Sequence, residues 1–174
     1  CRLCTAGAAA ARAGDGDAAM TLVTAGASVS TVIALAARDN AFDFVLRLLA
    51  GSSPPMDVDL LVAYCGPTAL CYACGAGRAD VVNALLSCGA NVHYVGWYSN
   101  GMPLQHAVRS GDASCVAACL DKGADVDAAG GPSDVVYDYV GAGHGRRSGV
   151  TARVEACARG HAGAGRAPVS YAHR

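Results

Sequence analysis

Residues 68–93 read TALCYACGAGRADVVNALLSCGANVH, and residues 102–127 repeat the same pattern as MPLQHAVRSGDASCVAACLDKGADVD. The second copy begins 34 residues after the first, and this offset is kept throughout, so that Gly77 recurs as Gly111. Similarity at a fixed period is the signature of a repeat protein. The same pattern can be followed backward along the chain, and it blurs beyond Asp127.

Each copy has the pattern of two short helices. Small and apolar residues recur at helical spacing over 69–76, Thr68 precedes them as an N-cap, and Gly77 permits a left-handed turn that ends the helix. A second helix is expected over 79–87. The residues that it turns towards the core are Val81, Val82, Leu85 and Leu86. One such pair is too small to close a core, but stacking it on a copy of itself buries both faces.

The repeated unit resembles the ankyrin repeat. The family's first-helix pattern T-P-L-H-x-A corresponds to residues 68–73 and 102–107, and its ending G-A-D-V-N corresponds to residues 89–93 and 123–127. Neither copy has the family's histidine, so we expect the reciprocal bond between that histidine and the threonine to be absent. The resemblance implies an all-α ankyrin-repeat solenoid of stacked helix-turn-helix units with short β-hairpin fingers.

The register extends in both directions from these two copies. Thr5 and Thr31 open two earlier repeats, and the short step between them predicts a tight turn in place of a projecting hairpin. The first helix of repeat one is nearly all alanine and is expected either to fray or to have packed on an earlier repeat that is now missing. The predicted ankyrin domain spans 1–159, with repeats at about 5–30, 31–67, 68–101 and 102–132, a degenerate C-terminal cap at 133–159, and a frayed or disordered tail at 160–174.

Two alignments compete for the cap. One places its first helix from Ser133 to His144 and the other from Thr151 to His161, and each puts a charged residue where a buried one belongs. We favour helices near 134–142 and 150–159, because terminal repeats need a polar outer face.

Bulk composition excludes several classes of function. The 174-residue chain has a net charge of −1 and a pI near 6.5, which gives no electrostatic attraction to nucleic acid or to an anionic membrane. It has no run of about 18 apolar residues that could span a bilayer and no apolar signal-peptide core. We expect an intracellular monomer, cytoplasmic or nuclear. The missing initiator Met indicates a fragment or a processed product.

The cysteines and histidines allow one rival interpretation, a zinc site. Cys71 and Cys74 lie three apart, Cys115 and Cys119 lie four apart, and His106 is the nearest histidine to complete such a site. We interpret the four thiols instead as small, buried and reduced core residues, because Cys115 and Cys119 fall on the inward positions of a helix. No metal is expected.

Catalytic motifs are missing as well. A phosphate-binding loop at 135–148 would need glycine and lysine where Arg146 and Arg147 stand. No G-x-S-x-G motif occurs, and Glu155 is the only glutamate in the chain. We therefore expect neither an enzyme nor a cofactor.

The resemblance implies that a partner protein binds in a concave groove and on the finger loops. Groove-side candidates include Leu35, Arg38, Asp39 and Ser110, and the finger before repeat three carries Leu60 and Leu61. The predicted contact residues are Tyr64, Tyr72, Tyr94, Trp97, Tyr98, Asn100, His106 and Arg109.

For the finger aromatics two interpretations stay open. Tyr94 and Trp97 either form an exposed hot spot or fold back to cover the edge between repeats three and four. At the level of function, the chain is predicted to be a protein-binding module. The alternative is a regulatory or substrate-recruiting ankyrin segment of a larger enzyme or adaptor.

Overall fold

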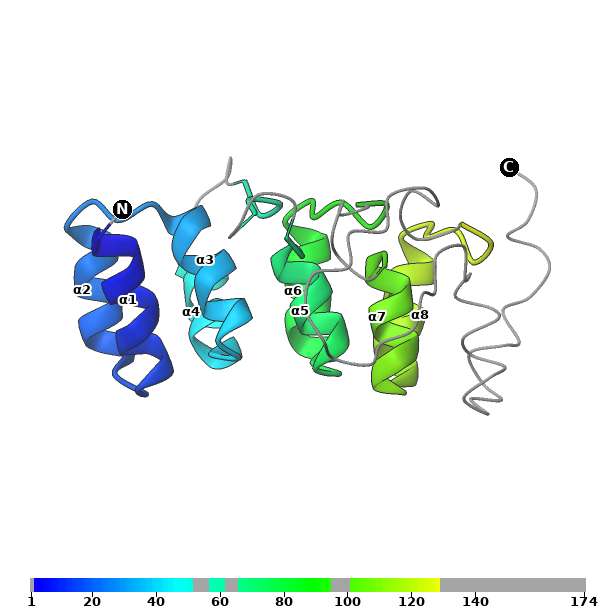
Figure 1. Cartoon of the computed structure of the whole chain (residues 1–174), viewed down its shortest axis with the longest axis horizontal. Coiled ribbons are helices and arrows are strands. Elements are labelled where there is room, and N and C mark those ends of the chain that lie inside the picture. The colour runs from blue at the N-terminus through cyan, green and yellow to red at the C-terminus, as the bar shows by residue number, and fades with distance from the viewer. Residues whose placement is uncertain (1, 52–56, 62–65, 95–100, 129–174) are drawn as a thin grey trace, which may run out of the picture.

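The computed structural model describes residues 2–51, 57–61, 66–94 and 101–128. Every regular element in them is an α-helix (Figure 1). The helices are α1 (Arg2–Arg12), α2 (Gly16–Thr24), α3 (Val29–Arg38), α4 (Phe42–Gly51), α5 (Ala69–Gly75), α6 (Ala79–Ser87), α7 (Pro103–Ser110) and α8 (Ala113–Asp121). The described parts of the predicted fingers form turns rather than strands, at 58–59, 92–93 and 126–127.

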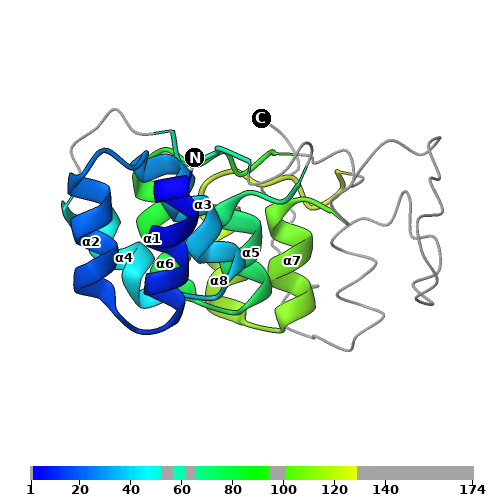
Figure 2. The same ribbon diagram turned by 60° about the vertical axis from the view of Figure 1, so that its left-hand side comes forward.

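The helices form two layers, which partly overlap in the turned view of Figure 2. Each odd-numbered helix packs on the even-numbered helix that follows it. Along the stack, α1, α3, α5 and α7 contact one another in succession, as do α4, α6 and α8. We call α1, α3, α5 and α7 the first-helix layer and α2, α4, α6 and α8 the second-helix layer. The predicted all-α solenoid is confirmed.

The core lies between the layers and between successive pairs. The four residues predicted to turn inward on α6 are all buried, and so are Cys115 and Cys119 on α8. Small residues dominate the contacting helix faces, since Ala69, Ala73 and Ala107 are completely buried. Small side chains allow neighbouring helices to approach closely, so that one pair packs flat on the next.

The ends of the first-layer helices keep the repeat register. Gly77 and Gly111 adopt left-handed φ angles of 67° and 79°, as expected of glycines that end a helix. Asn40 takes the equivalent position after α3 with a φ of 61°. Asparagine tolerates this conformation better than other residues with a side chain, so it replaces glycine there.

The starts of α1 and α3 differ from the prediction. Thr5 and Thr31, predicted to open the first two repeats, lie inside these helices. Ser28 caps α3 instead, because its hydroxyl accepts a hydrogen bond from the Thr31 amide at 3.4 Å. The Thr5 hydroxyl donates to the carbonyl oxygen of Arg2 at 2.9 Å. Several residue types can cap the start of a helix, whereas the left-handed residue after its end is usually glycine or asparagine. The sequence therefore specifies the start less precisely than the end.

The fraying predicted for the alanine-rich first helix is not observed, since α1 is regular over its full length. Alanine has the highest helix propensity, and Cys4, Ala8 and Ala11 are buried in the core. A methyl group on Gly7 would lie 3.7 Å from Val32 of α3, so this face packs closely. Four residues join α2 to α3, which is the tight turn expected between the first two repeats.

The predicted cap at 133–159 and tail at 160–174 lie outside the described residues, so both alignments of the cap stay open. None of the helices in the described ranges has the length and apolar character needed to cross a membrane.

Candidate partner-binding groove

The centre of the groove is formed where α5 and α7 pack side by side. Tyr72 on α5 and His106 on α7 are both half-buried. Gly75 lies one turn after Tyr72, and a methyl group added to it would be 3.6 Å from Nδ1 of His106. The missing side chain at Gly75 therefore leaves space beside the imidazole.

This space is a cavity of about 230 Å³. Its walls come from the turn after α3, from the chain that enters α5, and from α5 and α7 themselves. The lining residues are Asn40, Pro67, Cys71, Tyr72, Gly75, Ala76 and His106. We call this surface the groove. The structure thus brings together two of the predicted contact residues, Tyr72 and His106.

Burial raises the pKa of the Tyr72 phenol. The phenol therefore stays protonated at neutral pH and can both donate and accept a hydrogen bond. An aromatic ring with a polar tip is suited to a binding surface, because it provides apolar contact area and directional bonding together.

An ion-pair cluster flanks the groove on the side of repeats one and two. Asp39, directly after α3, accepts hydrogen bonds from Nε of Arg38 at 2.9 Å and from Nη2 at 3.3 Å. Nη1 of Arg12 lies 3.8 Å from Oδ2 of Asp39, the oxygen that also accepts from Nη2 of Arg38. The hydrogen bonds from Arg38 hold the pKa of Asp39 below its ordinary value, and both arginines attract the carboxylate.

Other groove-side candidates prove less available. Leu35 is buried in the core, so it offers little surface to a partner. The Ser110 hydroxyl donates to the carbonyl oxygen of Ala107 at 2.8 Å. Arg109 is half-buried in the last turn of α7, beside His106 on the same helix.

The finger residues are only partly described. Tyr94 folds back onto the chain that enters α5, where its hydroxyl donates to the carbonyl oxygen of Gly66 at 3.0 Å. This contact favours the covering interpretation for Tyr94. Leu60 and Leu61 are half-buried. The residues that lie outside the described ranges are Tyr64, Trp97, Tyr98 and Asn100.

At the starts of α5 and α7, the N-cap residue bonds the residue three positions later, although the family's histidine is missing. The Thr68 hydroxyl accepts from the amide of Cys71 at 3.4 Å and approaches the Cys71 thiol at 3.5 Å. In the next repeat, Oε1 of Gln105 accepts from the amide of Met102 at 3.1 Å. A thiol in one repeat and an amide oxygen in the next thus take the place of the family's imidazole.

The four cysteines considered for zinc are buried, and Sγ of Cys74 lies 3.7 Å from Sγ of Cys119. Their mutual contact and burial raise the pKa of Cys74, and burial also raises that of Cys71. Within the described ranges, no group of three or more His, Cys, Asp or Glu side chains is placed to hold a metal ion.

Five residues of the groove were not among the predicted contacts, namely Asn40, Pro67, Cys71, Gly75 and Ala76. The repeat offset identifies Gly75 as the counterpart of Arg109, 34 residues later. A glycine where the next repeat has a long side chain indicates that the space of that side chain is left unfilled.

Comparison with known families agrees with this architecture. A sequence model described as ankyrin repeats (3 copies) matches residues 8–95 and, in a second register, residues 33–130. A search of curated proteins finds no match. The two family matches together cover most of the chain and include all the helices from α2 to α8. With its stacked helix pairs and repeated turns, the chain belongs to the ankyrin-repeat family.

Proposed function

We propose that this chain binds a partner protein through the groove, with Tyr72 and His106 at the centre of the contact. Ankyrin repeats generally serve as protein–protein interaction modules. The observation that carries the proposal is the cavity of about 230 Å³, which lies between a half-buried phenol and an imidazole. A side chain from a partner would fill it and contact both rings.

Three features suit the groove to this role. Its two central side chains, Tyr72 and His106, lie on helices rather than on loops, so they are held by the packing of α5 on α7. Tyr72 provides an aromatic surface, which is enriched among the residues that dominate binding energies. Gly75 and Ala76 line the cavity, are exposed and have small or missing side chains, so they leave room for a bulky residue.

The proposal is tested by photo-crosslinking. A photoreactive phenylalanine analogue at Ala76 would be irradiated in an extract of the source cells, and the attached proteins identified by mass spectrometry. Tyr72→Ala and His106→Ala should each reduce the yield of the same attached protein by about tenfold, as expected for the loss of a central contact.

Asn83→Ala is the matched control, because Asn83 is exposed on α6 in the second-helix layer. It should leave the yield unchanged. A yield that responds equally to all three substitutions, or to none, would contradict the groove assignment. If the chain is a regulatory or recruiting segment of a larger enzyme or adaptor, the same experiment identifies what that protein recruits.

A further inference from the structure

Charge is segregated between the two helix layers. The helices of the first-helix layer contain four arginines and no acidic residue, which gives them a charge of +4. The helices of the second-helix layer contain four aspartates and one arginine, Arg47, which gives them a charge of −3. The net charge of −1 for the whole chain conceals this difference.

The arginines of the first-helix layer recur at one position of the repeat. Arg12, Arg38 and Arg109 each stand two residues before the left-handed residue that follows their helix. The fourth equivalent position, on α5, is Gly75, which opens the cavity of the groove. A row of three guanidinium groups is therefore interrupted by one pocket.

Helix stability alone does not explain this row. A basic residue in the last turn of a helix is stabilised by the helix dipole, and all eight helices have such a dipole. Yet none of the helices of the second-helix layer has a basic residue in its last turn. Arginines in the last turn of a helix are thus restricted to the layer that carries the groove.

Asp39 holds two of these arginines at the surface. Its own side chain is 13% exposed, whereas those of Arg12 and Arg38 are 63% and 45% exposed. The carboxylate is therefore largely covered and the two positive groups face water. A guanidinium group that is already oriented loses less freedom when it binds a second carboxylate.

We propose that the groove binds an extended acidic segment of the partner protein. Its carboxylates would pair with Arg12, Arg38 and Arg109, and a bulky side chain between them would enter the cavity beside Gly75. Guanidinium groups bind carboxylates with two parallel hydrogen bonds, which gives this pairing geometric specificity. The inference rests on the proposed function of the groove and adds the chemistry of the partner.

The repeat spacing sets the pattern of the acidic segment. Neighbouring helices in such a stack lie about 8–10 Å apart, and an extended chain rises about 3.3 Å per residue. Acidic residues for Arg12 and Arg38 would therefore be about three residues apart. Arg109 lies two repeats beyond Arg38, so the acidic residue that pairs with it would follow about six residues later in the segment.

The probe is a fluorescein-labelled peptide of about twelve residues with three glutamates at this spacing and a leucine aligned with Gly75. Its binding to the full chain is measured by fluorescence anisotropy at low ionic strength. Two peptides with glutamine or lysine in place of glutamate, and an RNA oligonucleotide of equal charge, serve as comparisons. The glutamate peptide should bind at least about tenfold more tightly than each of the others.

The variant Arg12→Gln, Arg38→Gln, Arg109→Gln should weaken binding of the glutamate peptide by at least about tenfold. Arg47→Gln is the matched control, since Arg47 is similarly exposed, at 54%, and is also paired with an aspartate, but lies on α4. It should change the affinity by less than about twofold. A triple Arg→Lys variant, which keeps the charges, should retain at least part of the affinity, and thermal unfolding of every variant verifies that it is folded.

Equal binding of the glutamine peptide, an equal effect of Arg47→Gln, or tighter binding of the RNA would overturn the inference. These outcomes are separate from those of the crosslinking experiment. A partner captured in a Tyr72-dependent way by the triple Arg→Gln variant would leave the groove function intact and refute an acidic partner. Loss of Tyr72 dependence would instead refute the groove itself.

Discussion

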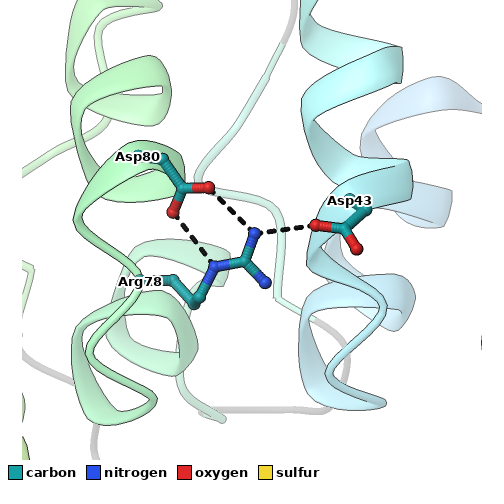
Figure 3. Close-up of polar contacts among 3 residues, drawn as sticks. All are labelled: Asp43, Arg78 and Asp80. Atoms are coloured by element: carbon teal, nitrogen blue, oxygen red, sulfur yellow. Dashed lines mark hydrogen bonds and ion pairs between the residues drawn. The ribbon is translucent and has the colours of Figure 1, made fainter.

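Arg78 links two successive repeats, because its Nη2 donates a hydrogen bond to Oδ1 of Asp43 at 2.8 Å (Figure 3). Asp43 belongs to α4, and Arg78 stands just before α6. The same guanidinium group binds both carboxylate oxygens of Asp80, at 3.1 and 2.8 Å. Its central carbon also lies 5.5 Å from the centre of the Phe42 ring. The Arg78 side chain therefore connects α4 to the start of α6, two helices of the second-helix layer that belong to successive repeats.

Arg78→Met should lower the free energy of unfolding by about 1 kcal/mol. The ion pairs stabilise the fold only slightly, because Asp43 is 90% exposed and water screens its charge. The contact of Arg78 with the Phe42 ring adds to this stabilisation. Urea denaturation of the variant and the wild type measures the difference. Asp43→Asn should cost less than Arg78→Met, and an equal cost would mean that neither the Phe42 contact nor the pair with Asp80 contributes.

Leu85→Ala should lower the free energy of unfolding by about 2–5 kcal/mol, because Leu85 is fully buried on α6 and the truncation leaves a cavity. Urea denaturation with an unchanged m-value would show that the loss is one of stability. Asn83→Ala on the exposed face of the same helix should stay within about 0.5 kcal/mol. Similar losses for both variants would contradict the observed register of α6.

Asp39→Asn should reduce stability at neutral pH and make unfolding less sensitive to acid. The pKa of Asp39 is lowered below its ordinary value of 3.8 by hydrogen bonds from Arg38. Its stabilising effect is therefore complete above pH 3.8 and is lost as the pH falls through the lower pKa of the folded state.

The measurement is urea denaturation of both proteins at several pH values from 7 down to 3. The difference in the free energy of unfolding should be about 1–3 kcal/mol at neutral pH and should shrink in the most acidic samples. A difference that is constant over this range would show that the carboxylate charge is not what stabilises the cluster.

Iodoacetamide should modify Cys88 in the native protein and leave the buried thiols of Cys71, Cys74, Cys115 and Cys119 intact. The thiolate is the reactive form, and burial raises the pKa of Cys115 to about 12, which keeps it protonated at pH 8. Mass spectrometry of tryptic peptides assigns the modified positions. The same reaction in concentrated urea is the control and should modify all of them, and native labelling of Cys74 as fast as Cys88 would contradict the observed burial.

The helices that carry the groove were predictable from local patterns. The exact bounds of α6 and the cap of α5 at Thr68 follow from residues a few positions apart, and both agree with the structure. The starts of α1 and α3 were not predicted correctly. For α3, the repeat spacing alone cannot distinguish Thr31 from Ser28 as the N-cap. The replacement of the family's histidine bond by Cys71 and Gln105 was also missed, since it depends on rotamers rather than on residue type.

The period of the repeat, the two helices within each unit and the burial of α6 were determined by the sequence alone, because helix propensity, caps and left-handed glycines act over a few neighbouring residues. Only the tertiary structure decided which side chains from different repeats meet. The pocket between Gly75 and His106 and the pairing of Arg12 with Asp39 depend on how closely and at what angle successive units pack. That geometry arises from the fit of whole helix faces, which no single segment of the chain specifies.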